Sequence, residues 1–206
     1  PGVVHTGEAA DTQGFELRAL YPSTSLMETA AFELTGRRTL PIFKEVLVDH
    51  RWATNSISSL HKAILAGAGM LESESRILWT ITQLIKRYAD VGSAEGLLGK
   101  EKRAIQQTRH YIEEHFAENI SLNVLAQHVS FSPYYLLRVF RAEVGMPPYA
   151  YLESVRIRHT QRLIKAGLTL AEVAAEVGFS SQSHMTRQFK KIIGVTPGQY
   201  AQHIRS

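Results

Sequence analysis

The sequence predicts a mainly α-helical protein. Its C-terminal half, residues 100–206, is predicted to be an all-α bipartite helix-turn-helix domain, in which two three-helix units share a linking helix. Three observations predict this fold: an internal repeat of about 48 residues, apolar side chains at helical spacing, and Ser, Thr, Pro and Gly at the expected helix ends. Residues 1–98 predict a truncated α+β segment before this domain.

The first half of the chain predicts one strand followed by helices. Apolar and polar side chains alternate over residues 14–21, which is the period-two pattern of a half-buried strand. Pro41 is placed to open a short helix, and apolar residues over 57–65 predict a second helix that ends at Gly67. Glycines and serine over 92–99 indicate a linker, about residues 90–99, between the two halves.

A third helix, residues 77–88, carries a continuous apolar stripe. Two kinds of partner could cover it: the helix's own domain, or a second subunit in a homodimer formed through helix 77–88. The stripe comprises Ile77, Leu78, Ile81, Leu84, Ile85 and Tyr88.

The internal repeat places helix-turn-helix units at about 121–145 and 169–194, behind a supporting helix that begins near Ile105. The spacing between copies is 48 residues before the turn and 49 after it, and Thr169 with Glu172 predicts a capping box in the second copy. Between the two copies, the sequence of residues 149–166 predicts the linking helix. The matched pairs include Leu122 with Leu170, Ala126 with Ala174, Phe131 with Phe179, Arg138 with Arg187, Phe140 with Phe189, and Gly145 with Gly194.

Charge is divided unequally between the halves. Residues 1–98 hold 9 Lys or Arg against 11 Asp or Glu, a net −2, whereas residues 99–206 hold 14 against 8, a net +6. A basic helical domain suits a polyanion such as nucleic acid. An anionic membrane surface is the weaker alternative, and RNA is disfavoured because its common signatures are missing.

Composition and motifs argue against an enzyme. The chain has no cysteine, which excludes disulfides, thiol nucleophiles and alkyl transfer to a thiolate. No hydrolase, zinc-protease, Walker A or dinucleotide motif is present, and no His or Glu near His5 completes a metal site, so we expect no catalytic residue, metal or cofactor. Neither a secretory signal nor an apolar stretch long enough to span a bilayer is seen, which predicts a cytoplasmic protein without membrane contact.

The two copies, LAQHVSFSPYYLLRVFRAEVGMPPYAYL and LAEVAAEVGFSSQSHMTRQFKKIIGVTPGQY, resemble the two halves of the DNA-binding domain of AraC/XylS-type transcriptional regulators. The resemblance implies that both recognition helices enter successive major grooves of double-stranded DNA. The first ninety-odd residues, from PGVVHTG, are similar to the end of the family's cupin-type effector-binding and dimerisation domain, and would form a partial regulatory segment. RNA polymerase and a small-molecule effector are the further partners that this resemblance suggests.

Helical geometry at 100° per residue selects the side chains that face away from each unit's core. With Met185, Phe189 and Ile192 inward, Ser183, Arg187 and Lys190 face outward, flanked by His184 and Lys191. In the first unit Leu136, Val139 and Phe140 face inward, which turns Tyr134, Arg138 and Arg141 outward, with Tyr135 and Leu137 at the sides. By resemblance, the base-reading residues are Tyr134, Leu137 and Arg138 in the first recognition helix, and Gln182, Ser183, His184 and Arg187 in the second. Arg141, Lys190 and Lys191 are better placed for phosphates, while Arg156, Arg158, Arg162 and Lys165 could contact phosphates or bond Glu113 or Glu153.

Overall fold

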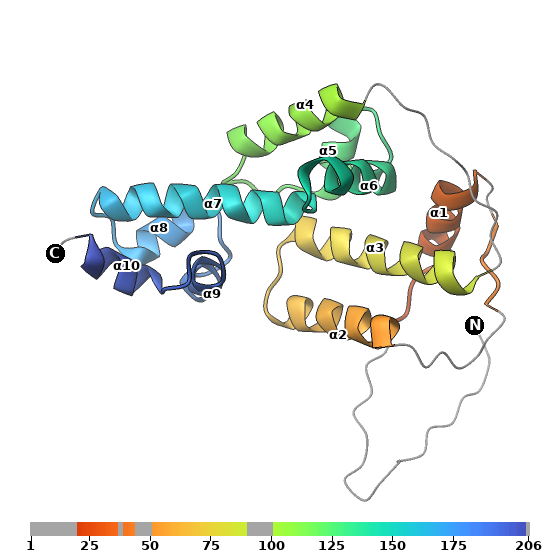
Figure 1. Ribbon diagram of the computed structural model, residues 1–206, viewed down its shortest axis with the longest axis horizontal. Helices are drawn as coiled ribbons and strands as arrows, with labels where there is room; N and C mark the ends of the chain where they lie inside the picture. The colour runs from red at the N-terminus through yellow and green to blue at the C-terminus, as the bar shows by residue number, and fades with distance from the viewer. Residues whose placement is uncertain (1–19, 37–38, 44–50, 90–100, 205–206) are drawn as a thin grey trace, which may run out of the picture.

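The computed structural model describes residues 20–36, 39–43, 51–89 and 101–204. These residues form ten helices (Figure 1). The helices are α1 (Thr24–Thr35), α2 (Arg51–Leu65), α3 (Met70–Tyr88), α4 (Glu101–Glu114), α5 (Leu122–His128), α6 (Pro133–Val144), α7 (Pro148–Lys165), α8 (Leu170–Glu176), α9 (Gln182–Ile193) and α10 (Pro197–His203).

The mainly α-helical fold is confirmed, but the α+β character expected of the first half is not seen in the described residues. They contain no named strand, and their β pairing is one isolated antiparallel bridge between Phe43 and Ala89. The strand predicted at 14–21, most of the short helix after Pro41 and the linker at 90–99 lie largely or wholly outside the described residues.

Helix α1 was not identified from the sequence, although its end signals are present. The side chain of Ser23 accepts a hydrogen bond from the backbone N–H of Leu26, and Gly36 ends the helix with a positive φ of 71°. The predicted capping box of Thr169 and Glu172 is present at α8. The caps at Ser23 and Thr169 satisfy backbone donors that the first turn of a helix otherwise leaves unpaired, and Gly36 donates its N–H to the carbonyl of Phe32 in the last turn.

Two helix-turn-helix units share α7, as predicted (Figure 1). The core of the first includes Leu125, Leu136 and Phe140, and is closed by residues from the first half of α7, such as Val155. The core of the second unit includes Val173, Met185 and Phe189 and is closed by Ile157 and Ile164, farther along α7. Because one continuous helix contributes to both cores, it fixes the two units relative to each other.

The turn within each unit uses a left-handed residue at the same repeat position. Gly178 has φ 75° in the second unit, and Ser130 has φ 57° in the first. A Cβ atom on Gly178 would lie 2.2 Å from the carbonyl oxygen of Ala117. Glycine is therefore required in the second turn both by its backbone conformation and by the close approach of the preceding chain.

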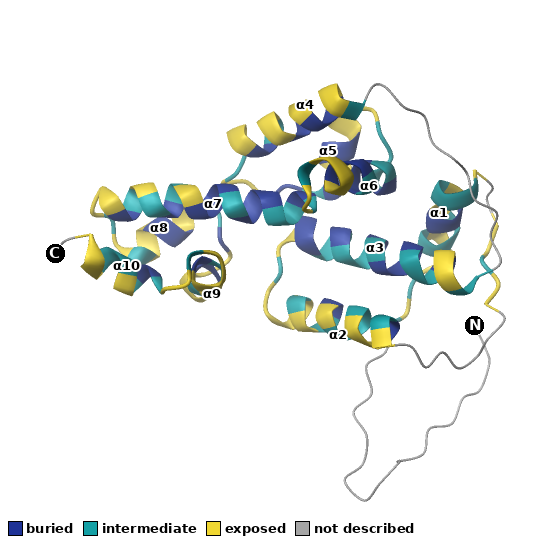
Figure 2. Ribbon diagram, in the orientation of Figure 1, coloured by how far each residue is buried: buried dark blue, intermediate teal, exposed yellow. Residues whose placement is uncertain are grey.

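Helix α3 joins the first half of the chain to the first helix-turn-helix unit. Leu71 and Leu78 belong to the same buried cluster as the core of that unit, whereas Ile81 and Ile85 pack with Ala30 of α1. Buried residues accordingly recur along α3 in Figure 2. Much of the apolar stripe of residues 77–88 is thus covered within the chain by α1 and by the first helix-turn-helix unit, rather than left exposed for a second subunit.

Candidate nucleic-acid interface

Helix α9, the predicted second recognition helix, presents a polar outer surface. Ser181 caps its start by accepting a hydrogen bond from the backbone N–H of His184, and Gly194 ends it at φ 93°. Met185 and Phe189 are fully buried in the unit core. The predicted DNA-contacting residues that lie exposed on this helix are Gln182, Ser183, Arg187, Lys190 and Lys191. The inward orientation predicted for Ile192 is wrong, since its side chain is 43% exposed.

His184 does not lie on the exposed surface, although it was predicted to flank the reading face. His184 is only 6% exposed. The ring Nδ1 of His184 lies 3.0 Å from the hydroxyl oxygen of Ser180, and the ring packs edge-on against Phe179. Burial lowers the pKa of His184, Arg187 lowers it further, and the Glu72 carboxylate of α3 opposes the shift. As it stands, this imidazole supports the turn and is not presented to a base edge.

Arg187 is exposed but is held by the first half of the chain. Its guanidinium donates a hydrogen bond of 2.6 Å to the carbonyl oxygen of Ala66. Ala66 follows α2, and the next residue, Gly67, comes so close to the start of α9 that a Cβ there would lie 4.0 Å from the hydroxyl oxygen of Ser180. The connection between α2 and α3 therefore contacts the second recognition helix directly.

On helix α6, the predicted first recognition helix, side-chain exposure differs from the prediction more than it does on α9. Tyr134 is 6% exposed and Leu137 is 1% exposed, so the outward placement predicted for Tyr134 and the side placement predicted for Leu137 are wrong in this arrangement. The reason is tertiary, because α1 and α3 both pack against α6. Burial raises the pKa of Tyr134, and Arg138 and the nearby Thr82 of α3 oppose this shift.

The two arginines of α6 lie against aromatic rings. Arg138 is half-buried, with its guanidinium 4.9 Å from the ring centre of Tyr135 on the same helix. The guanidinium of Arg141 lies 4.8 Å from the ring centre of Trp79, which belongs to α3. Both geometries suit cation–π contacts. One of the predicted phosphate-binding cations is thus in contact with the first half of the chain.

Two carboxylates from the first half bond to the start of the helix-turn-helix helices. Glu33 of α1 accepts a hydrogen bond of 2.5 Å from the hydroxyl of Ser132, the N-cap of α6. Glu74 of α3 accepts one of 2.6 Å from the backbone N–H of Leu122 in α5. The sequence offered no sign of either bond, because the partners are 99 and 48 residues apart. Glu33, Glu74, Tyr134 and Leu137 lie where α1 and α3 pack against the first unit. We call this contact the closed interface.

Arg156 takes neither of the two roles that the sequence left open for the cations of α7. Arg156 is buried and donates hydrogen bonds to the carbonyl oxygens of Phe116 at 2.7 Å and Glu118 at 2.9 Å. Burial lowers its pKa to about 10, opposed by the Glu153 carboxylate. Arg156 is therefore structural, whereas Arg158, Arg162 and Lys165 are exposed.

The described residues show neither a metal cluster nor a membrane-crossing helix. No group of three or more His, Asp or Glu side chains in this part of the chain is arranged to hold a metal ion. None of the helices in these ranges is both long and apolar enough to traverse a bilayer. What the site offers is a set of cations and amides on two helices of a rigid frame, which is the chemistry of groove binding.

Comparison with known families finds matches in both halves. Residues 125–203 match the family described as "Helix-turn-helix domain", and residues 1–81 match the family described as "AraC-like ligand binding domain".

Individual relatives agree with these matches. The HTH-type transcriptional regulator YbfI of Bacillus subtilis is 33% identical over 185 residues, covering 90% of this chain and 67% of that protein. An HTH-type transcriptional regulator of Staphylococcus aureus is 33% identical over 109 residues, covering 52% of this chain but only 14% of that protein. Among solved structures, the DNA-binding domain of AdpA in complex with a target DNA is 26% identical, with a TM-score of 0.48, over 50% of this chain and 93% of that one.

Proposed function

Because the chain belongs to the AraC family of helix-turn-helix transcriptional regulators, we propose that it places α6 and α9 in successive major grooves of one operator, and that a small-molecule effector controls this binding. The observation that carries the proposal is the repeat, in which two units of the same design are built on one helix, α7. A frame of this kind presents two recognition helices to one face of a duplex.

Residues 100–206 form the DNA-binding domain in this proposal, and residues 1–98 form part of the effector-binding and dimerisation domain. Gln182, Ser183 and Arg187 read bases from α9, because they are exposed on its outer surface and can bond base edges. His184, Tyr134, Leu137 and Arg138 read bases once the segments that cover them move. Lys190, Lys191 and Arg141 contact phosphates.

The closed interface explains how an effector could control this binding. Tyr134 and Leu137 are buried and α1 packs on α6, so α6 cannot enter a groove while α1 and α3 remain in place. DNA binding through both units therefore requires the first half to separate from the first unit. A ligand that binds one arrangement better than the other shifts this equilibrium by its difference in affinity.

Operator geometry tests the proposal. Helix α7 has 18 residues and so is about 27 Å long at 1.5 Å per residue. With the width of the units added, this suits grooves about one helical turn, roughly 34 Å, apart. The two helices carry different outer residues, so one chain should protect an asymmetric site. The measurement is footprinting of the chain and of residues 100–206 on a site selected from random DNA.

Insertion of five base pairs between the two half-sites supplies the control, because it turns one groove to the opposite face. We expect protection of one half-site to be lost after this insertion. Ten inserted base pairs return both grooves to the same face of the duplex but leave them farther apart. A symmetric footprint, or unchanged affinity after the five-base-pair insertion, contradicts two-groove binding by one chain.

A further inference from the structure

A cavity of about 280 Å³ lies between the first half of the chain and the first helix-turn-helix unit. Its walls come from α2, α3, the end of α6 and the start of α7, and include the aromatic rings of Trp52, Trp79 and Tyr149. Its volume is near the lower end of small-molecule sites, which begin at roughly 300 Å³. Flat rings on several walls suit a planar ligand group.

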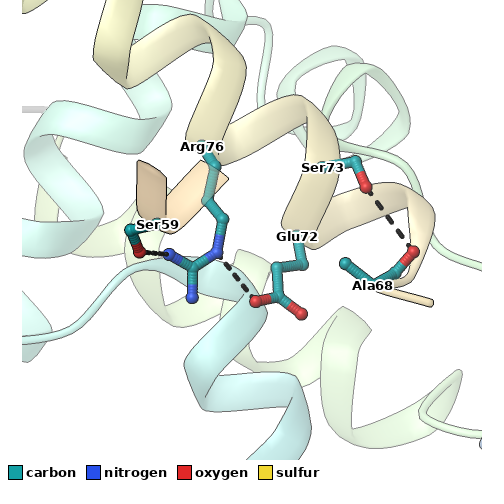
Figure 3. A network of polar contacts seen from close by, with 5 residues as sticks. All are labelled: Ser59, Ala68, Glu72, Ser73 and Arg76. Carbon is teal, nitrogen blue, oxygen red and sulfur yellow. Dashed lines mark hydrogen bonds and ion pairs between the residues drawn. The ribbon is translucent and has the colours of Figure 1, made fainter. Parts of the chain in front are cut away.

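The cavity is also rich in guanidinium groups. Arg76 and Arg141 line it, and Arg87 stacks 4.4 Å above the ring of Trp52. Arg76 is held in place, donating hydrogen bonds to the Glu72 carboxylate at 2.7 Å and to the hydroxyl of Ser59 at 3.2 Å (Figure 3). Glu72 pairs with Arg76, and the Glu153 carboxyl also lies near Tyr149, so Arg141 is the lining cation that no described carboxylate pairs with.

Arg141 is the cation best placed to meet a ligand. Its guanidinium stacks on Trp79, and no carboxylate of the described residues forms an ion pair with it. Stacking orients the plane of a guanidinium while leaving its N–H donors at the edge. Such an edge matches the paired oxygens of a carboxylate or phosphate.

An unsatisfied polar atom lies in the same wall. Ser75 is 2% exposed, and its hydroxyl has no hydrogen-bond partner among the described residues. A buried hydroxyl without a partner is disfavoured, and helical serines usually bond a carbonyl one turn earlier. Because Ser75 lines the cavity, a ligand oxygen that enters can accept its hydrogen bond.

We propose that this cavity binds a small ligand that carries a flat ring and one oxyanion group, either a carboxylate or a phosphate ester. The ring lies among the aromatic walls, the oxyanion bonds Arg141 and Arg76, and the Ser75 hydroxyl donates to a ligand oxygen. Ligand binding in this cavity does not depend on the proposed function. Only the regulatory role of that binding rests on it. The ligand would bridge α3 and α6 through Arg141, and so hold the closed interface together.

The chain supplies its own reporter, because its two tryptophans, Trp52 and Trp79, both line the cavity. Tryptophan fluorescence of the whole chain is titrated with benzoate and with phenyl phosphate. The uncharged analogues benzamide and phenol are matched controls for the oxyanion, and inorganic phosphate is the control for the ring. We expect a saturable change with the two ring-bearing anions and at least tenfold weaker binding of the controls.

Variants identify the site. Arg141→Gln should weaken benzoate binding about tenfold, the loss expected for a hydrogen bond between charged groups, and Ser75→Ala about fivefold. Arg103→Gln removes an exposed charge from α4, outside the cavity, and should leave binding unchanged. Equal responses to benzoate and benzamide overturn the proposal, as do unchanged affinities in both cavity variants or the absence of saturable binding by either anion.

Electrophoretic mobility shift on the selected operator, measured on the same preparations, separates the two proposals. Intact operator binding without any ligand response overturns the ligand site alone. Ligand binding without sequence-specific DNA binding overturns the proposed function and leaves the site standing.

Discussion

The guanidinium of Arg187 donates a 2.6 Å hydrogen bond to the carbonyl oxygen of Ala66, 121 residues earlier in the chain. The residue proposed to read a base in the second groove is thus bonded to the connection between α2 and α3. Combined with the burial of Tyr134 under α1 and α3, this bond means that both predicted recognition helices, α6 and α9, contact the first half of the chain.

Arg187→Ala should weaken binding to the selected operator by about 1 to 3 kcal/mol and relax the preference at one base pair, because a bidentate base contact is lost. Lys190→Ala is the control, since loss of a phosphate contact weakens all sequences about equally. Both variants are titrated against the operator and a scrambled duplex. If Arg187→Ala loses the same factor on both duplexes, its role is electrostatic only.

Removal of the carboxylates of the closed interface should strengthen DNA binding. Glu33→Gln and Glu74→Gln weaken the bonds to Ser132 and to the backbone of Leu122, which favours separation of α1 and α3 from the first unit. We expect roughly 3- to 10-fold tighter operator binding, which is about 0.7 to 1.4 kcal/mol, because Gln keeps an acceptor oxygen and loses only the charge.

Glu28→Gln removes the same charge from α1. Within the described residues Glu28 forms no hydrogen bond or ion pair with the first unit, so this variant measures the purely electrostatic gain. Equal affinities for Glu28→Gln and Glu33→Gln on the operator would mean that the Glu33 bond does not hold the interface closed.

Gly178→Ala should destabilise the chain by about 2 to 4 kcal/mol, because the methyl group would meet the carbonyl of Ala117 at 2.2 Å in a residue with φ 75°. Gly145→Ala is the matched control. That glycine has φ 78° but no atom within 4 Å of its Cβ position, so we expect only about 1 kcal/mol. Urea unfolding measures both, and equal losses would show that the turn relaxes around the added methyl.

Glu153 should make stability depend on pH. Burial and the nearby Glu72 carboxylate raise its pKa from 4.5 to about 7, opposed by Lys191, Arg76 and Arg156. A raised carboxyl pKa adds stability below pH 4.5 that is lost as the pH rises through 7. Glu153→Gln should therefore be more stable than the parent chain at pH 8, by up to about 3 kcal/mol. The stability advantage of the variant should be smaller at pH 5.5.

Urea unfolding at the two pH values measures this difference, with the exposed Glu143→Gln as control. A Glu153→Gln variant with no greater advantage at pH 8 than at pH 5.5 would show that the carboxyl is not strained by burial.

Phenyl phosphate, if it occupies the cavity beside Arg141, should weaken operator binding severalfold, because it stabilises the arrangement in which α6 is covered. Linkage requires operator DNA to weaken phenyl phosphate binding by the same factor. Operator affinity is measured with and without saturating ligand, and benzamide is the control. Tighter operator binding with phenyl phosphate would reverse the assigned direction of control.

The sequence by itself determined the helix-turn-helix half, because the signals there are local. Apolar spacing, the caps at Ser132 and Thr169 and the turn at Gly178 each act within a few residues, and the repeat presents them twice. The same spacing correctly placed Arg187 on the exposed side of α9.

Only the tertiary structure decided what covers the recognition helices. The rule that placed Tyr134 outward is correct for one unit alone, but a helix face turned away from its own core can still be buried by another element. Here α1 and α3 bury it, and the bonds from Glu33 and Glu74 span 99 and 48 residues. Contacts between residues so far apart depend on how whole helices pack, which no local spacing encodes.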